Sequence, residues 1–200
     1  MKKLTKLNLE ELSNNLPTLS QEELRINQGG YFCFDSNGNF LGQTGDNSEV
    51  RVMTRSDYDQ NKGMGEYGIM MHSEALYSIR GTSREQIIKR IGTMNGYNVE
   101  VDYGDQSIYG WVNPTGNGGS GSIVINANSN SSVTCNYYDY VCTMIHEQQH
   151  INTPDDAGTA FSEYQAYNTV INSSAFQYAS SSYRQGTIML RDAYGELLGY

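Results

Sequence analysis

The chain has 200 residues, a length that suits one domain or one domain with a short appendage. Its formal net charge is −9 and no cluster of Lys and Arg is visible, so the composition argues against nucleic acid as a partner. The sequence has no run of eighteen apolar residues, so it predicts no membrane span. Only 38% of the residues are apolar, but sixteen tyrosines can contribute large rings to a core.

The first thirty residues differ from the rest of the chain. They hold four basic and four acidic residues, so the whole −9 belongs to residues 31–200. They lack the apolar stretch of a secretory signal peptide, and Gly29-Gly30 ends the segment. Taken alone, this pattern is typical of an amphipathic helix that docks on the domain. Four leucines recur at helical spacing: Leu9, Leu12, Leu16 and Leu19.

The motifs "KKLTKLNLEEL" and "LSQEEL", followed by Gly29-Gly30, resemble the double-glycine leader peptides of bacteriocins and related secreted natural-product precursors. The resemblance implies that a peptidase-containing ABC transporter cuts after Gly30 and exports the remainder. The mature protein would then begin at Tyr31 and be secreted. A propeptide that silences an enzyme is the alternative that we keep for residues 1–30.

Residues 31–44 read as strand, turn and strand around Asn37-Gly38. Polar residues at 35, 37 and 39 also suggest a calcium loop, but Phe40 replaces the glycine that such a loop needs. We therefore expect a hairpin here.

The remaining pattern predicts a single α+β domain over residues 31–200, without an internal repeat. Segment 64–79 fits a strand or a helix equally well. Thr82 or Ser83 can cap the helix at 82–96, and Gly96 can end it. We expect strands at 49–60, 97–104 and 122–129, a turn-rich loop at 113–121, and helices at 82–96, 138–151, 160–176 and 183–198.

The segment "HEQQH" holds two of the three histidines in the chain. His146 and His150 are four residues apart on a predicted helix, so both imidazoles leave one face and can bind one metal ion. Glu147 points about 100° away around the helix, where it can act on water without being a ligand. This arrangement is the H-E-x-x-H motif of zinc metallopeptidases.

A catalytic zinc ion needs a third protein ligand. Glu163 is the preferred candidate, because it lies thirteen residues after His150 on a helix that can pack against the first. Asp155 and Asp156 are nearer alternatives, but they fit turn or cap roles as well. His72 is the third alternative for this ligand.

The motifs "HEQQH" and "EYQAY" resemble those of the gluzincin group of zincin metallopeptidases, with Ala166 at the small position of the second motif. The resemblance implies a zincin-like α+β domain with a small mixed or antiparallel sheet and an active-site helix. It also implies a zinc ion held by His146, His150 and Glu163. The strand at 122–128 would be the edge strand that binds an extended peptide.

The expected activity is zinc-dependent hydrolysis of a peptide or protein substrate, with Glu147 as the general base. Tyr167 or His72 can stabilise the oxyanion. Two alternatives stay open: an exported bacteriocin-like or toxin-like effector, and an inactive zincin-fold binding module. The sequence also leaves open a disulfide between Cys135 and Cys142.

Overall fold

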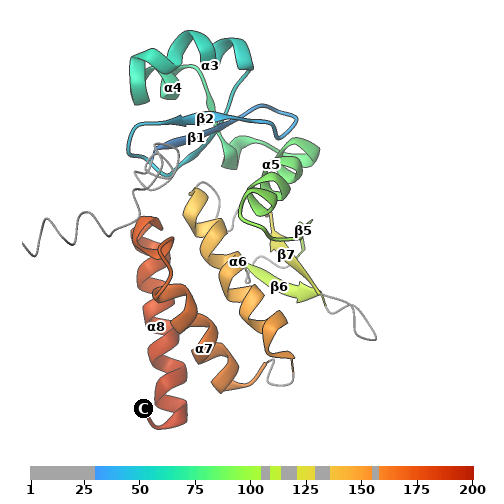
Figure 1. Ribbon diagram of the computed structural model, residues 1–200, viewed down its shortest axis with the longest axis vertical. Coiled ribbons are helices and arrows are strands. Elements are labelled where there is room, and N and C mark those ends of the chain that lie inside the picture. Colours follow the sequence, from blue (N-terminus) through green and yellow to red (C-terminus); the bar gives the residue numbers. More distant parts are fainter. Residues whose placement is uncertain (1–29, 105–108, 114–120, 129–135, 155–157) are drawn as a thin grey trace, which may run out of the picture.

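The computed structural model describes residues 30–104, 109–113, 121–128, 136–154 and 158–200. It shows an α+β protein with two small mixed sheets and a set of helices (Figure 1), which confirms the predicted fold class at that level. Residues 1–29 of the leader expected at 1–30 lie outside the described residues, as do most of the turn-rich loop at 113–121 and Cys135.

The first sheet has four strands in the order β2-β1-β3-β4. The hairpin predicted around Asn37-Gly38 is confirmed: the side chain of Asp35 accepts hydrogen bonds from the backbone nitrogens of Asn37 and Asn39, each at 2.9 Å. Strand β3 runs parallel to β1, and β4 antiparallel to β3. The strands are β1 (Tyr31–Phe34), β2 (Phe40–Thr44), β3 (Val50–Val52) and β4 (Glu74–Ala75).

Strand β1 is buried on both faces because it lies between two apolar clusters. Tyr31 and Cys33 belong to a small cluster that also contains residues of α3 (Arg55–Asn61) and α4 (Gly65–Met71). Phe32 and Phe34 point the other way, into the main core. The alternation of side chains along a strand produces this division.

The prediction of a strand at 49–60 is wrong beyond residue 52, where β3 ends. Thr54 caps helix α3 instead, because its hydroxyl accepts a hydrogen bond from the backbone nitrogen of Asp57. Segment 64–79 becomes helix α4, strand β4 and two 3₁₀ turns at its margins, η1 (Lys62–Met64) and η2 (Leu76–Ser78).

Helix α5 (Gly81–Met94) lies between the two sheets in Figure 1. The predicted caps Thr82 and Ser83 are wrong, because the helix starts at Gly81 with Arg80 as an N-cap that makes no side-chain bond. The predicted stop is confirmed: Gly96, with φ +80°, follows the helix end.

The second sheet has three strands in the order β5-β7-β6. Strand β7 pairs in parallel with β5 and antiparallel with β6. Its five residues are all buried. The strands are β5 (Val99–Asp102), β6 (Gly110–Asn113) and β7 (Ser122–Asn126).

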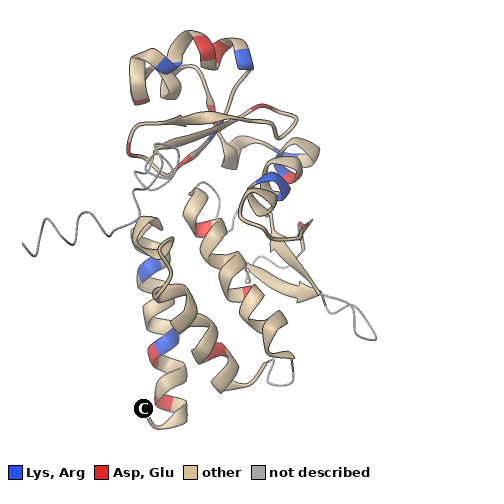
Figure 2. Cartoon of the chain, in the orientation of Figure 1, with Lys and Arg blue, Asp and Glu red and all other residues tan. Residues whose placement is uncertain are grey.

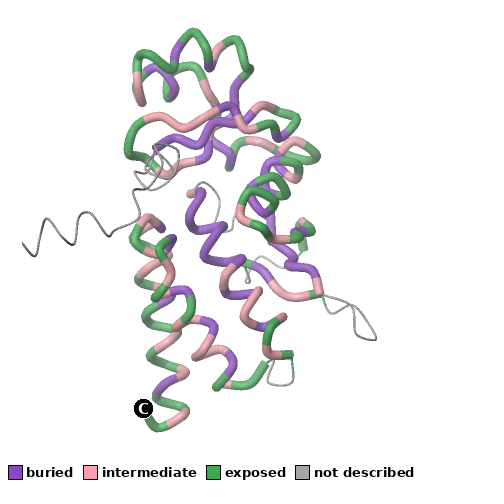
Figure 3. The backbone as a smooth tube through the Cα atoms, in the orientation of Figure 1, coloured by how far each residue is buried: buried purple, intermediate pink, exposed green. Residues whose placement is uncertain are grey.

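Three helices complete the domain: α6 (Tyr137–Asn152), α7 (Ala160–Ile171) and α8 (Ser181–Leu198). They lie side by side in Figure 1, with α7 in contact with both α6 and α8. The helix predicted at 160–176 ends early, and a 3₁₀ turn, η4 (Phe176–Tyr178), follows. Figure 3 shows α6 buried over much of its length, so this helix anchors the site in the core.

Candidate metal centre and its cleft

Helix α6 holds the histidine pair in a fixed place. It begins at a strong cap, since the side chain of Asn136 accepts hydrogen bonds from the backbone nitrogens of Tyr138 and Asp139. Buried apolar residues on the turns before His146 fix the helix to the core. The helix ends at Asn152, just ahead of Pro154, as the sequence predicts.

Helix α7 brings the glutamate to the histidines. Its cap is Thr159, whose hydroxyl accepts a hydrogen bond from the backbone nitrogen of Ser162 at 3.1 Å. Glu163 follows in the first turn of α7. Because α7 packs against α6, the first turn of α7 faces the last turns of α6.

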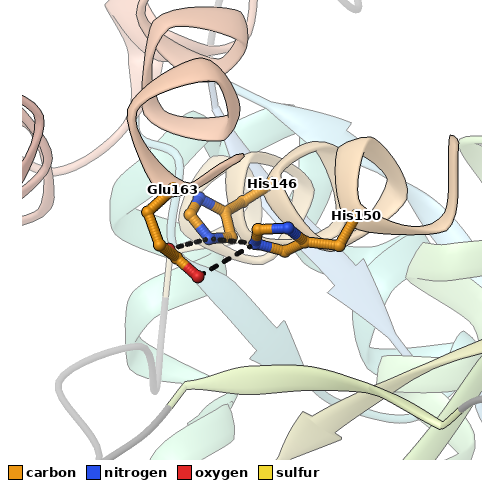
Figure 4. A group of neighbouring side chains, drawn as sticks. All are labelled: His146, His150 and Glu163. Atoms are coloured by element: carbon orange, nitrogen blue, oxygen red, sulfur yellow. Dashed lines mark hydrogen bonds and ion pairs between the residues drawn. The ribbon is translucent and has the colours of Figure 1, made fainter. Parts of the chain in front are cut away.

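The three predicted ligands converge, as Figure 4 shows. The Nε2 atoms of His146 and His150 are 3.1 Å apart. The carboxylate oxygens of Glu163 lie 3.3 Å from Nε2 of His146 and 3.4 Å from Nε2 of His150. Both histidines are buried and the glutamate is partly buried, so the group sits at the bottom of a cleft rather than on a surface.

These separations match the requirements of a tetrahedral ion. Ligand bonds of 2.0–2.1 Å at tetrahedral angles place neighbouring donor atoms about 3.3 Å apart. The observed distances of 3.1, 3.3 and 3.4 Å are close to that value. Two imidazoles and one carboxylate are also a donor set that zinc accepts in catalytic sites.

Local contacts prepare these side chains for a cation. Nδ1 of His150 lies 2.9 Å from the hydroxyl oxygen of Ser162, which orients the ring so that Nε2 faces the cluster. Burial lowers the pKa of His150, which favours the neutral ligating form. A hydrogen bond with His146 lowers the pKa of Glu163, which favours its carboxylate. Nδ1 of His146, by contrast, is buried and has no hydrogen-bond partner among the described residues.

Glu147 lies in the same cleft as the ligands but is not one of the three converging residues. Its side chain is 7% exposed. Burial raises the pKa of its carboxyl group to about 7. A buried carboxylate that protonates readily is suited to proton transfer.

The cleft occupies about 450 Å³ between strand β6 and helices α7 and α8, with α6 as its floor. Tyr167 lies in it, with its ring centroid 4.4 Å from that of His146. His72 lies elsewhere, at the C-terminal end of α4, where it lines a separate cleft beside the first sheet. Asp155 and Asp156 lie outside the described residues.

The prediction that the strand at 122–128 is a substrate-binding edge is wrong. Strand β7 is the middle strand of its sheet, so both of its hydrogen-bonding edges are already paired. Within the described residues, the edge strand that lines the cleft is β6. Of the two edge strands, β5 and β6, a peptide that adds a strand from within the cleft would therefore pair with β6.

A glycine allows β6 to lie close to α6. A Cβ atom at Gly110 would lie 2.9 Å from the carbonyl oxygen of Val124, 3.0 Å from Cγ2 of Thr143 and 3.4 Å from Cγ of Glu147. Gly110 and Ser162 were not predicted from the sequence. Neither were the cleft-lining residues of α8, although these recur at helical spacing: Tyr183, Leu190 and Tyr194.

Comparison with protein-family models, with curated proteins and with solved structures finds no match for this chain. In the part of the chain that the structure describes, none of the helices combines the length and the apolar character needed to cross a membrane.

Proposed function

We propose that residues 31–200 form a zinc-dependent peptidase of the gluzincin-like zincin type. The observation that carries this proposal is the convergence of Nε2 of His146, Nε2 of His150 and the carboxylate of Glu163 at 3.1–3.4 Å. Glu147 lies in the same cleft, outside this ligand set, where a general base is needed.

A zinc ion in this site supplies Lewis acidity, which polarises a peptide carbonyl group and makes water a stronger acid. Glu147 takes a proton from the attacking water, whose oxygen forms a bond to the carbonyl carbon. The carbon–nitrogen bond then breaks, and Glu147 gives its proton to the departing amine. The products are a carboxylic acid and an amine, so one water is consumed for each bond cut.

Other residues of the cleft fit supporting roles. Strand β6, which is an edge strand of the sheet in the described chain, can pair with an extended peptide. Tyr167, which contacts the ring of His146, is the better of the two predicted oxyanion donors because His72 lines a different cleft.

Residues 1–30 fit a leader that a peptidase-containing ABC transporter removes after Gly30, with secretion of the remainder. The first strand begins at Tyr31, directly after the double glycine, which supports a boundary at this point. The secreted peptidase would then act on peptides or proteins outside the cell.

Metal analysis and peptide hydrolysis with matched variants of the full chain test this function. The purified protein should hold about one zinc ion per chain, and Glu163→Ala or His146→Gln should abolish that binding. Glu147→Gln should retain zinc but lower kcat by at least about 10²-fold. His72→Gln is the control, because it alters the one histidine outside the cluster.

Three other outcomes would contradict the proposal. A protein that binds no zinc at neutral pH has another role, such as an exported toxin-like effector. One that binds zinc but cleaves no peptide is a binding module with a zincin-like site. Cleavage that survives Glu147→Gln within a few-fold of the parent would exclude Glu147 as the base.

A further inference from the structure

The cleft beside the metal ligands has an unusual composition. Among the described residues, the carboxylates that line it are Glu147 and Glu163, which already have roles as base and ligand. No Lys or Arg of the described chain lines it. In Figure 2, helices α6 and α7 carry no Lys or Arg, and the two arginines of α8 lie outside the cleft lining.

Aromatic and aliphatic side chains form the walls. On α8, Tyr183, Leu190 and Tyr194 are seven and four residues apart, so they lie on one face of the helix. Across the helix pair, the ring of Tyr194 stacks on that of Tyr167, with their centroids 6.0 Å apart. Tyr109, just before β6, lies 6.3 Å from the ring of Tyr183.

Part of this wall is available to a ligand. Leu190 is 45% exposed although it lines the cleft. Large apolar groups that line a concave site without being covered are typical of ligand contacts. A substrate side chain that covers them would gain the usual hydrophobic free energy.

The charges of the cleft also decide which part of a polypeptide it can bind. A peptidase that removes C-terminal residues must bind a free carboxylate, which needs a cation such as Arg. The described lining offers none. One that removes N-terminal residues needs a carboxylate for the free ammonium group, and both carboxylates of the described lining are already used.

We propose that the cleft is that of an endopeptidase selective for internal segments with aromatic or large aliphatic side chains, and that Tyr167, Leu190 and Tyr194 set this selectivity. The inference rests on the proposed peptidase function. Acidic side chains are disfavoured next to the cut bond, because the walls that receive them are apolar and aromatic and the described lining has no Lys or Arg to pair with their charge.

Blocked peptides test the proposal. Decapeptides with acetylated and amidated ends, carrying Phe, Leu, Ala or Asp beside a single cut site, should be cleaved as fast as their unblocked forms. The value of kcat/KM should be about 10–200-fold higher for Phe or Leu than for Ala, the usual range for filling an apolar pocket. Asp peptides should be the poorest substrates.

Variants of α8 test which residues set the substrate selectivity. Leu190→Lys should lower kcat/KM for the Phe peptide about tenfold or more and raise it for the Asp peptide, because it places a cation in the cleft wall. Tyr194→Ala should lower the preference for Phe over Ala by a similar factor. Met189→Ala is the matched control, since Met189 is the neighbouring residue on α8, is 65% exposed and does not line the cleft.

A binding measurement separates this inference from the peptidase function itself. The zinc-loaded Glu147→Gln protein should bind blocked Phe peptides at least tenfold more tightly than blocked Ala or Asp peptides, whether or not the parent turns them over. Equal binding of all peptides would overturn the selectivity, and cleavage of unblocked peptides alone would overturn the endopeptidase assignment. If the parent cleaves no peptide but the binding preference holds, only the peptidase function fails.

Discussion

The Nδ1 atom of His150 lies 2.9 Å from the hydroxyl oxygen of Ser162, so the first turn of α7 orients a ligand that belongs to α6. Ser162 is fully buried, and its backbone nitrogen bonds to the cap residue Thr159, which fixes its position. His146 has no equivalent support from the described part of the chain, where its buried Nδ1 atom finds no hydrogen-bond partner.

Ser162→Ala should therefore weaken zinc binding by about 10–100-fold, the usual effect of removing a hydrogen bond to a metal-ligating histidine. Competition with a chelator of known affinity measures the change. Ser56→Ala, on the exposed side of α3, is the control and should leave the affinity unchanged. An unchanged affinity in Ser162→Ala would mean that packing alone orients His150.

The histidine pair could be predicted because it depends on local geometry, whereas Glu163 was predicted from its place on a helix that can pack against the first. Residues four apart on a helix share a face whatever the rest of the chain does. The edge position of β6 could not be predicted, since it depends on which strand pairs with β7 across long stretches of chain. Likewise, the alternation of Val50 and Val52 predicts a longer strand. The hydrogen bond that Thr54 makes as an N-cap instead starts helix α3 at this point.

Arg84 leads to a prediction about stability. It lies on the buried face of α5 with Ile88 and Ile91, and it is 0% exposed. No group of the described chain accepts a hydrogen bond from its Nε, Nη1 or Nη2 atoms. Burying a charge without partners is costly, so an apolar side chain of similar length should be preferred.

Arg84→Met should accordingly raise the free energy of unfolding by about 1–4 kcal/mol, the range seen when apolar residues replace buried charges. Urea titration of the parent and the variant measures the difference. Arg90→Met, at an exposed position of the same helix, should change stability little. A destabilised Arg84→Met protein would show that the guanidinium group has a partner that stabilises the fold.

Asp139 should make stability depend on pH. It is 2% exposed, and its carboxylate accepts hydrogen bonds from the backbone nitrogen and hydroxyl of Ser180, at 2.7 and 2.6 Å. Burial nevertheless raises its pKa from 3.8 to about 6. Between these values the folded chain keeps a proton that the unfolded chain has lost, so stability falls as pH rises from about 4 to 6.

The contribution of this residue to that fall is up to about 3 kcal/mol, since one pKa unit corresponds to about 1.4 kcal/mol. Asp139→Asn, which cannot titrate, should show a flatter dependence of unfolding free energy on pH over the same range. Both proteins are measured with a chelator present, which removes bound metal, so that the other titrating groups contribute equally to the two curves. Parallel curves would show that Asp139 keeps an ordinary pKa in the folded protein.

The last prediction concerns the bond between Gly30 and Tyr31, where the leader would be removed. Gly30 is buried with φ +144°, and a Cβ atom there would overlap the carbonyl oxygen of Gly45 and lie 2.9 Å from that of Thr44. The four residues after it form the fully buried strand β1. A peptidase needs several residues on each side of the cut in extended, accessible form, so the folded domain should protect this bond.

The native 1–200 protein should therefore resist a double-glycine leader peptidase at Gly30, whereas the urea-unfolded chain is cut rapidly after dilution into the enzyme. Gly42→Ala should speed cutting of the native protein, because a Cβ atom there would overlap the hydroxyl group of Tyr58 and loosen β2 beside β1. Gly63→Ala is the matched control, since nothing lies within 4 Å of its Cβ position. Under the leader interpretation, removal must precede folding, so equal rates for native and unfolded protein would contradict this order of events.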